Sequence, residues 1–275
     1  MATTFEKMHG LGNDFVLLDL RHQDFSIDSD MAIRLSNRHT GIGCDQVLVL
    51  HHPLESRHLA RFEIWNADGS QAEQCGNGMR CLGLYLQMRS EAPPGPFLLG
   101  GPAGEVAIEC LDDGLVRVNM GKPDFDPAHI PVLLEPQEGW YTLGIEQNHY
   151  KVGAVSMGNP HALMLVDDVN RLDVARLGAA ISCHAAFPEG CNAGFAHIID
   201  RQNIHLRVFE RGAAETQACG SGACAAMSIL SKAGLVDKTI KVTQAGGNLI
   251  LSWTKGDSSV IMTGAATHVF EGNLA

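Results

Sequence analysis

Long apolar runs are missing from this 275-residue sequence, and none approaches the roughly 20 residues that a membrane-spanning helix needs. The first residues, Met1 to Lys7, also lack the apolar core of a secretory signal peptide, so we expect a cytoplasmic protein. Positive charge is scarce, with 20 lysines and arginines against 31 aspartates and glutamates. The resulting net charge of −11 argues against a nucleic-acid or anionic-membrane partner, because either would favour a basic surface.

The motif Cys-x-x-Cys is also missing, although the chain has eight cysteines. The absence of Cys-x-x-Cys excludes a thioredoxin-like redox pair and a common zinc knuckle, and we expect no metal. In a cytoplasmic chain the cysteines should be reduced thiols. Cys81 and Cys224 are expected to be small buried core residues. Four more are expected to be structural or incidental: Cys44, Cys110, Cys183 and Cys191.

The two remaining cysteines open matching segments, Cys75-Gly-Asn-Gly78 and Cys219-Gly-Ser-Gly222. Each precedes a stretch of helical character, residues 76–89 and 220–232. A cysteine at the start of a helix lies beside unpaired backbone N–H groups, which favour the thiolate and lower the thiol pKa from about 8.5. One such site indicates a reactive thiol. Two matched sites indicate a reaction that needs a sulfur on each side of the substrate.

Other positions recur in the same order at nearly the same offset. Asn13 and Asn159 are 146 residues apart, as are Gln46 and Asn192, while Asn66 and Glu210 are 144 apart, as are the two cysteines. A period near half the chain indicates a duplicated domain, with two pseudo-symmetric halves that face a shared cleft. We expect the first half to span residues 1–121, with 264–275 returning to it, and the second half to span 122–263.

Short alternating apolar segments predict many strands, for example 47–50, 62–65, 106–108, 116–120, 162–166, 195–199, 204–209, 240–243 and 249–253. Residues 31–38 and 172–181 are typical of amphipathic helices. The helices after the two cysteines are apolar on nearly all sides and must be buried. The sequence therefore predicts an α+β fold in which each half wraps a mainly antiparallel sheet around a central helix, with the active site in the interdomain cleft. The proline-rich residues 123–136 are expected to form the linker.

Two opposed thiols can invert a carbon that lies beside a carboxylate. One thiolate removes the α-proton from one face and the other thiol returns a proton to the opposite face, while N–H groups at the helix starts stabilise the carbanion. Such a two-base racemase or epimerase needs no organic cofactor. His161 and Glu210 could exchange protons with the cysteines. Arg211 could hold a second carboxylate in a bidentate pair.

Several motifs resemble those of the diaminopimelate epimerase family, over almost the whole chain from Phe5 to Gly272. They are His9-Gly-Leu-Gly-Asn-Asp-Phe15, Asn66-Ala-Asp-Gly69, Cys75-Gly-Asn-Gly78, Met157-Gly-Asn-Pro-His161, Glu210-Arg-Gly212 and Ala218-Cys-Gly-Ser-Gly222. The resemblance implies interconversion of LL- and meso-diaminopimelate without pyridoxal phosphate or metal, in lysine and peptidoglycan precursor synthesis. It also implies two pseudo-symmetric α+β domains and a homodimer.

The resemblance assigns Cys75 and Cys219 as the two acid/base residues, with His161 and Glu210 adjusting their charge state. It implies that the reacting carboxylate is bound at the helix starts by Gly76, Asn77, Gly220 and Ser221. It implies that the remainder of the substrate is positioned by Asn13, Gln46, Asn66, Asn159, Asn192, Glu210 and Arg211.

The chain departs from the family pattern at three places. The common Pro-Glu-Arg-x-Asn reads Pro188-Glu-Gly-Cys-Asn192 here, Phe270 replaces a common tyrosine near the dimer contact, and Cys44 replaces a bulkier apolar residue before Gln46. The first departure concerns loop geometry rather than the chemistry.

Three alternatives stay open. A related racemase of the proline or hydroxyproline type would share the two-thiol chemistry, although proline racemases place Gly-His-Gly beside the first cysteine, where this chain has Asn77. A cysteine hydrolase or acyltransferase would use Cys219 with His161 and would leave Cys75 without a function. A non-catalytic amino-acid-binding protein would explain a two-lobed cleft but would not need a thiol on each side.

Overall fold

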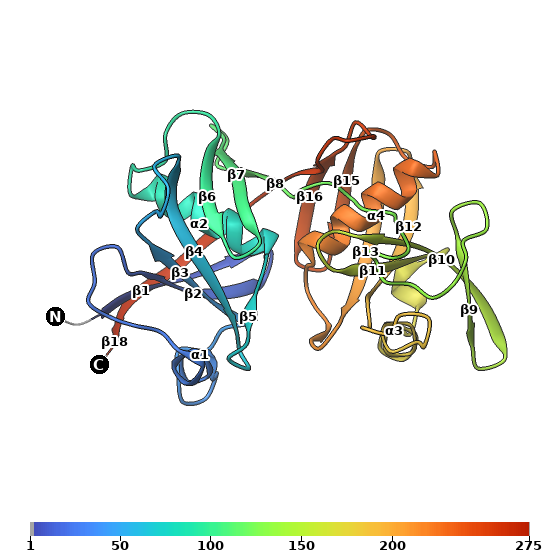
Figure 1. The fold of residues 1–275 in the computed structure, drawn as a ribbon, viewed down its shortest axis with the longest axis horizontal. Helices are drawn as coiled ribbons and strands as arrows, with labels where there is room; N and C mark the ends of the chain where they lie inside the picture. The colour runs from blue at the N-terminus through green and yellow to red at the C-terminus, as the bar shows by residue number, and fades with distance from the viewer. Residues whose placement is uncertain (1–2, 275) are drawn as a thin grey trace. The chain divides into compact units, whose positions relative to one another are not determined.

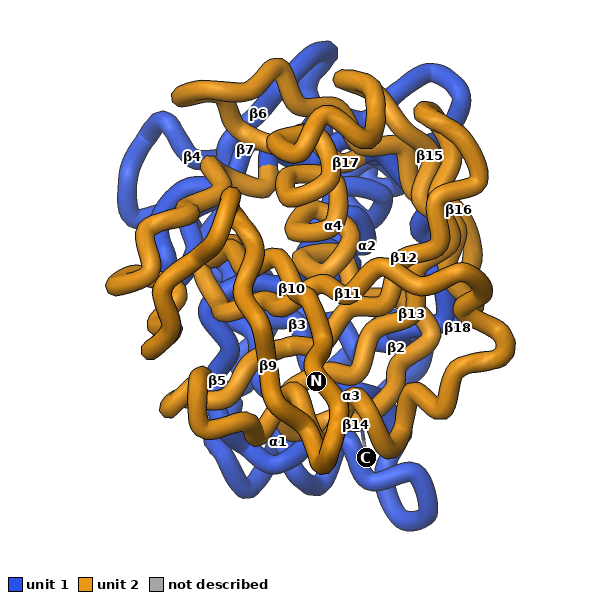
Figure 2. Tube along the Cα trace, turned by 90° about the vertical axis from the view of Figure 1, so that its right-hand side faces the viewer, with its two compact units in different colours: residues 1–119, 263–275 blue, residues 120–262 orange. Residues whose placement is uncertain are grey.

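A computed structural model of the chain describes residues 3–274, so positions 1, 2 and 275 of the expected first half lie outside the described residues. The chain divides into two compact units (Figure 2). The first unit comprises residues 1–119 and 263–275, and the second unit comprises residues 120–262. Within the described residues, no helix is long and apolar enough to cross a membrane.

The elements of the first unit are β1 (Thr3–Gly10), β2 (Asn13–Asp19), α1 (Ser29–Ser36), β3 (Gln46–His51), β4 (His58–Asn66), β5 (Gln71–Ala72), α2 (Gly76–Met88), β6 (Phe97–Gly101), β7 (Gly104–Cys110), β8 (Val116–Asn119) and β18 (Thr267–Leu274). Strand β1 pairs antiparallel with both β2 and β18. The parallel pair β2–β3 is connected through α1, and the parallel pair β4–β6 is connected through α2. The pairs β3–β4, β4–β5, β6–β7 and β7–β8 are antiparallel.

The elements of the second unit are β9 (Tyr141–Ile145), β10 (Asn148–Ser156), β11 (Pro160–Leu165), the 3₁₀ turn η1 (Val169–Arg171), α3 (Val174–Ser182), β12 (Asn192–Asp200), β13 (Asn203–Glu210), β14 (Ala214–Glu215), α4 (Gly220–Lys232), β15 (Thr239–Gln244) and β16 (Gly247–Ser252). Strand β17 (Ile261–Gly264) lies where the chain leaves this unit. The parallel pairs β11–β12 and β13–β15 are connected through α3 and α4. The pairs β9–β10, β10–β11, β12–β13, β13–β14 and β15–β16 are antiparallel.

The two units repeat one topology. In each, an antiparallel pair leads through a helix to a parallel strand, and a second helix connects a second parallel pair (Figure 1). The helices α1 and α3 occupy one equivalent position, and α2 and α4 occupy the other. The predicted fold class is therefore confirmed, as two pseudo-symmetric α+β units with mainly antiparallel sheets.

The helices that follow the two cysteine motifs are buried, as predicted. Met79, Leu82 and Leu86 of α2 are fully buried, and the small residues of α4, such as Ala223 and Ala226, are inaccessible as well. Each large apolar side chain removed from water contributes about 1.5–3 kcal/mol, so these helices organise the cores of their own units. Cys81 and Cys224 are both fully buried in these helices, which confirms that they are core residues.

The segment expected to be a linker, residues 123–136, instead packs on the second unit. Ile130 is fully buried and Val132 nearly so, and both belong to a hydrophobic core together with Phe187 and Phe195. Asp124 forms an isolated β-bridge with Ser156. The prolines end regular structure in this segment, but its apolar residues still bury their side chains.

Helix α3 approaches β13 closely at Gly178. A Cβ atom built on Gly178 would lie 2.4 Å from the Cβ atom of Phe209. The position of a Cβ atom is fixed by the backbone, so Phe209 cannot move aside by changing its rotamer. Gly178 is therefore needed for close packing of the helix on the sheet.

We expect Gly178→Ala to destabilise the protein, although alanine is the better helix former. The gain in helix propensity is about 1 kcal/mol, whereas overpacking costs about 1–3 kcal/mol at such a site. Urea unfolding measures the difference in the free energy of unfolding. The control is Ala179→Gly, at the exposed neighbouring position of the same helix, which reports the propensity term alone. A higher free energy of unfolding for Gly178→Ala would contradict the packing argument.

Candidate active site

Both cysteines of the repeated motif cap a helix. Cys75 is the N-cap of α2 and its sulfur accepts the Gly78 N–H at 3.5 Å, while Cys219 is the N-cap of α4 and its sulfur accepts the Gly222 N–H at 3.3 Å. These are the positions where Ser, Thr, Asp or Asn usually accept such a bond. A thiol in this place lies at the positive end of a buried helix, where an anion is stabilised.

The second glycine of each motif gives the helix start its close contact with the sheet. A Cβ atom at Gly78 would lie 2.9 Å from Cδ2 of Leu48, and one at Gly222 would lie 3.0 Å from Cγ2 of Val208. At Gly222 the added atom would also lie 3.2 Å from the Cys219 sulfur. The second glycine of Cys-Gly-x-Gly is therefore needed because a side chain at this position would crowd the neighbouring strand and, in α4, the capping sulfur.

In the first unit, Asn13 connects the turn after β1 with the start of α2. The turn contains Leu11 and Gly12, both with positive φ, and it brings Asn13 to the helix start. Asn13 Oδ1 accepts hydrogen bonds from Asn77 Nδ2 at 3.1 Å and from the Cys75 thiol at 3.7 Å. The predicted residues Asn13, Cys75 and Asn77 therefore form one cluster.

The other two amides predicted in the first unit lie opposite each other on neighbouring strands. Gln46 of β3 and Asn66 of β4 are register partners, and Gln46 Nε2 donates to Asn66 Oδ1 at 2.8 Å. Asn66 Nδ2 donates in turn to Ser70 Oγ at 3.0 Å. Both amides are thereby oriented by neighbouring groups before any ligand is considered.

In the second unit, His161 is the centre of a buried polar cluster. Its Nε2 lies 2.9 Å from Asn159 Oδ1 and 3.5 Å from Asn192 Nδ2. Asn192 Oδ1 accepts the Arg211 N–H at 2.9 Å. Burial, and secondly the charge of Arg211, lower the pKa of His161 to about 3, so its imidazole is neutral at physiological pH.

Cys219 lies beside the carboxylate of Glu210, the second predicted acid/base partner. Burial, and then the charge of Glu210, raise the pKa of Cys219 well above its usual value. The Ser221 hydroxyl, 3.6 Å from the sulfur, and the Gly222 N–H act in the opposite direction. The expectation of a lowered thiol pKa is therefore wrong for Cys219, because desolvation of the thiolate outweighs the helix start. Cys219 is a protonated thiol at neutral pH.

Some residues in these clusters have no repeated offset, so the sequence did not reveal them. Asp45 Oδ2 accepts the Asn13 amide at 2.9 Å, and Arg38 binds both Asp45 and Asp14. Thr216 donates its hydroxyl to Glu210 Oε1.

Gln244 is a further residue that the sequence did not single out. It is buried, and its Oε1 accepts the backbone N–H of Cys219 at 2.9 Å. Its Nε2 has no hydrogen-bond partner among the described residues. Gln244 ends β15, one residue beyond the strand predicted at 240–243, so only its three-dimensional position connects it with Cys219.

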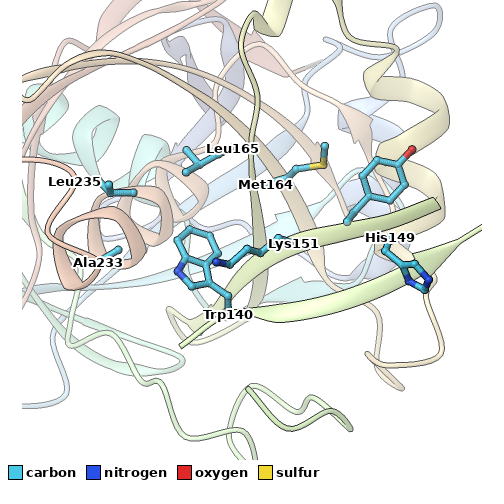
Figure 3. Close-up of a pocket in the computed structure, with 8 residues that line it drawn as sticks. Trp140, His149, Lys151, Met164, Leu165, Ala233 and Leu235 are labelled. Carbon is cyan, nitrogen blue, oxygen red and sulfur yellow. The ribbon is translucent and has the colours of Figure 1, made fainter. Parts of the chain in front are cut away.

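A cavity of about 500 Å³ in the second unit contains none of these candidates (Figure 3). Its walls include Trp140, Tyr150 and Met164, and Lys151 Nζ lies 5.4 Å from the centre of the Trp140 ring. The chemistry of the repeated motifs is therefore located elsewhere. Within residues 3–274, no group of three or more His, Cys, Asp or Glu side chains is arranged to hold a metal ion.

Sequence comparison identifies proteins that are similar to this chain. Residues 5–125 and 153–269 match the profile of the family described as diaminopimelate epimerase. A diaminopimelate epimerase of Teredinibacter turnerae is 44% identical over 274 residues, which cover 100% of this chain and 99% of that protein. Another, from Xanthomonas campestris pv. campestris, is 44% identical over 98% of this chain and 95% of its own length.

Solved structures of the same fold have much lower sequence identity. A hydroxyproline epimerase from Agrobacterium vitis has a TM-score of 0.72 at 15% identity, over 100% of this chain and 94% of its own. A phenazine biosynthesis protein from Bacillus anthracis has a TM-score of 0.68 at 14% identity, over 100% of this chain and 99% of its own. These two likenesses establish the fold.

We expect His161 to make stability depend on pH. The unfolded chain takes up this proton near pH 6.5 but the buried imidazole only near pH 3, so the unfolded state binds more protons between these values. The contribution is complete above pH 6.5 and is lost at about 1.4 kcal/mol per pH unit as the pH falls through this window. Denaturant unfolding at several pH values should show a smaller loss for His161→Gln than for the wild type. Equal losses in both proteins would contradict the buried neutral imidazole.

Proposed function

The chain belongs to the diaminopimelate epimerase family and is an isomerase of lysine biosynthesis, and we propose that Cys75 and Cys219 carry out its two proton transfers. One observation carries this proposal: the same residue type caps the equivalent helix in both units, with its sulfur on a glycine N–H. Serine or aspartate would cap these helices equally well, so stability alone does not require cysteine.

The proposed reaction interconverts LL- and meso-diaminopimelate at one α-carbon. A thiolate takes the α-proton from one face, and the electron pair of the broken C–H bond moves into the adjacent carboxylate. The opposite thiol then gives its proton to the other face, and a new C–H bond forms with inverted configuration. Backbone N–H groups at the helix starts would bind the carboxylate and its developing charge, at Gly76, Asn77, Gly220 and Ser221.

Glu210 and His161 are proposed to set the charge state of the thiols. Because Cys219 is protonated beside the Glu210 carboxylate, it is ready to donate a proton, and Glu210 is placed to accept that proton when Cys219 must act as the base. His161 is a neutral imidazole and, with a pKa of about 3, a weak base, so its proposed effect on the thiols is that of an uncharged hydrogen-bonding group. The same site can therefore start from either isomer.

The remaining predicted residues are proposed to position the rest of the substrate. The amides of Asn13, Gln46, Asn66, Asn159 and Asn192 suit amine and carboxylate groups. Glu210 is also proposed to touch the substrate. Arg211 has five N–H donors and gives one of them to the Glu189 carbonyl at 2.7 Å, so its planar fork suits a second carboxylate.

We further propose that the enzyme is a cytoplasmic homodimer that works without pyridoxal phosphate. The substrate is proposed to bind between the first half, residues 1–121 with 264–275, and the second half, residues 122–263. The helix starts supply the carbanion stabilisation that a cofactor would otherwise provide. The proline-type racemase remains the second candidate, because a hydroxyproline epimerase shares the fold. A cysteine hydrolase is disfavoured because it would leave one of the two capping cysteines without a function.

Replacing either cysteine should abolish epimerisation. We expect Cys75→Ala and Cys219→Ala each to lose at least about 10²–10⁴-fold in turnover, the usual contribution of a general acid or base. Turnover is measured with diaminopimelate in D2O, as deuterium entering the α-carbon together with the change of isomer. Cys183→Ala, at an exposed cysteine, is the control and should stay active. Near-normal turnover of Cys75→Ala would show that the two-base mechanism is wrong.

The enzyme should also reject amino acids that lack a second amino-carboxylate centre. Polar groups left unpaired by a short substrate give discrimination of about 10⁴-fold at sites of this kind. The ratio of kcat/KM for diaminopimelate to that for alanine or proline measures it. Comparable values on proline would instead identify a broad-specificity racemase.

A further inference from the structure

Gln244 connects a neighbouring strand with the cysteine that caps α4. It is the last residue of β15, and it is 6% exposed. The atom that faces the Cys219 N–H at 2.9 Å must be the amide oxygen, because a backbone N–H can only donate. A second bond joins the same two segments, from the Gly246 N–H to the Gln217 carbonyl at 2.8 Å. The turn between β15 and β16 therefore holds the loop that leads into α4.

Helix α4 itself cannot supply a side chain that binds the Cys219 N–H. In a capping box, a Glu or Gln at the third helical position reaches back to the N–H of the cap residue. That position is Gly222 here, which has no side chain. A Cβ atom at Gly222 would already lie 3.0 Å from Cγ2 of Val208, so a longer side chain would crowd the sheet. Gln244 thus provides from β15 the acceptor that a capping box takes from the helix.

The first unit has no side chain at the equivalent position. Gln244 ends β15 opposite Gly247. In the same way, Gly101 ends β6 opposite Gly104. A Cβ atom at Gly101 would lie 2.1 Å from Cζ of the buried Phe62 ring, so β6 cannot carry a glutamine there. The contact from strand to cap is therefore a property of the second unit and not of the repeated topology.

Stability gives no reason for a glutamine at this place. With Gln244 present, its Nε2 is a buried donor that has no partner among the described residues. An apolar residue of similar length would remove that donor, but it would also take the acceptor away from the Cys219 N–H. Each arrangement carries the free-energy penalty of one unpaired buried donor. The glutamine changes only which donor is unpaired, and the capping cysteine gains a fixed partner.

A fixed N–H at Cys219 keeps the sulfur in its place. The peptide group before Cys219 cannot rotate without losing the bond to Gln244. Such a rotation would change φ of Cys219 and carry its side chain away from the Gly222 N–H, which the sulfur now accepts at 3.3 Å. Misplacing a reacting group by about 1 Å can cost about 100-fold in rate. Gln244 Nε2 is inaccessible, so the residue acts through the cysteine backbone rather than by touching the substrate.

We propose that Gln244 is a positioning residue for Cys219. It completes the cap of α4 from β15 and so holds the Cys219 sulfur over the Gly222 N–H, ready for proton transfer at the α-carbon. The inference rests on the proposed acid/base role of Cys219 and adds a residue outside the repeated motif on which that role depends. Gln244 does not itself exchange a proton.

Gln244→Met tests the positioning role, because methionine keeps the length of the side chain and lacks the amide. We expect kcat for diaminopimelate epimerisation to fall about 10–100-fold with KM unchanged, since the groups that bind the substrate are retained. The matched control is Gln217→Met, the same substitution at an exposed position two residues before Cys219. It leaves the backbone bond to Gly246 in place and should keep the wild-type kcat.

Amide hydrogen exchange reports the bond itself. In full-length protein with isotope-labelled cysteine, the NMR signal of the Cys219 amide is identified by its loss in Cys219→Ala. In Gln244→Met we expect this amide to exchange at least about fivefold faster, the effect of losing one hydrogen bond of typical strength. The amide of Cys81, in the core of the first unit, should keep its rate. Gln244→Glu retains an acceptor oxygen at the same place and should keep most of the protection.

Two results would overturn the proposal: a wild-type kcat in Gln244→Met, or an equal acceleration of exchange at Cys219 and Cys81, which would indicate a general loosening of the protein. If Gln244→Met does not unfold cooperatively, Gln244→Asn decides, because it keeps the amide but is one methylene too short to reach the Cys219 N–H. The same loss of kcat is expected, and a wild-type kcat would refute the positioning role. Failure of the proposed acid/base role would appear separately, as turnover of Cys219→Ala.

Discussion

A sulfur that accepts a backbone N–H at the start of a buried helix is the interaction on which the rest of this structure depends. It fixes Cys75 and Cys219 at the only end of each helix where an anion is stabilised. The helices must be buried for this to matter, because water would screen their partial charges. The glycines of the motif, the small residues of α4 and the strands that cover both helices all support that single contact.

Duplication supplies two equivalent thiols, and the surrounding residues then make them different. The position occupied by Asn66 in the first unit is Glu210 in the second. Proton transfer across a carbon needs one thiolate and one thiol, and a difference in surroundings decides which sulfur carries the proton. The carboxylate of Glu210 beside Cys219, at a position where the first unit has a neutral amide, is one such difference.

The electrostatic environment of a side chain is the property that a local stretch of sequence determines least. A helix start lowers a thiol pKa in isolation, but the Cys219 pKa is raised because burial and a neighbouring carboxylate act more strongly. Desolvation depends on everything packed around the group, and no window of sequence contains that information. Burial is likewise not visible in residues 123–136. Their proline content suggested a linker, but Ile130 and Val132 are buried in the hydrophobic core of the second unit.

The sequence by itself determined the repeated motif, the two buried helices after Cys75 and Cys219, and the fold class, because glycine spacing and apolar periodicity are local properties. It also identified the candidate thiols and amides through their constant offsets. Only the tertiary structure decided which groups meet: Asn77 with Asn13, Gln244 with the Cys219 N–H, and Asp45 with Asn13. These contacts join residues from different elements without a shared pattern. Their effect comes from burial and charge at a point in space, which is a property of the packed molecule rather than of any segment.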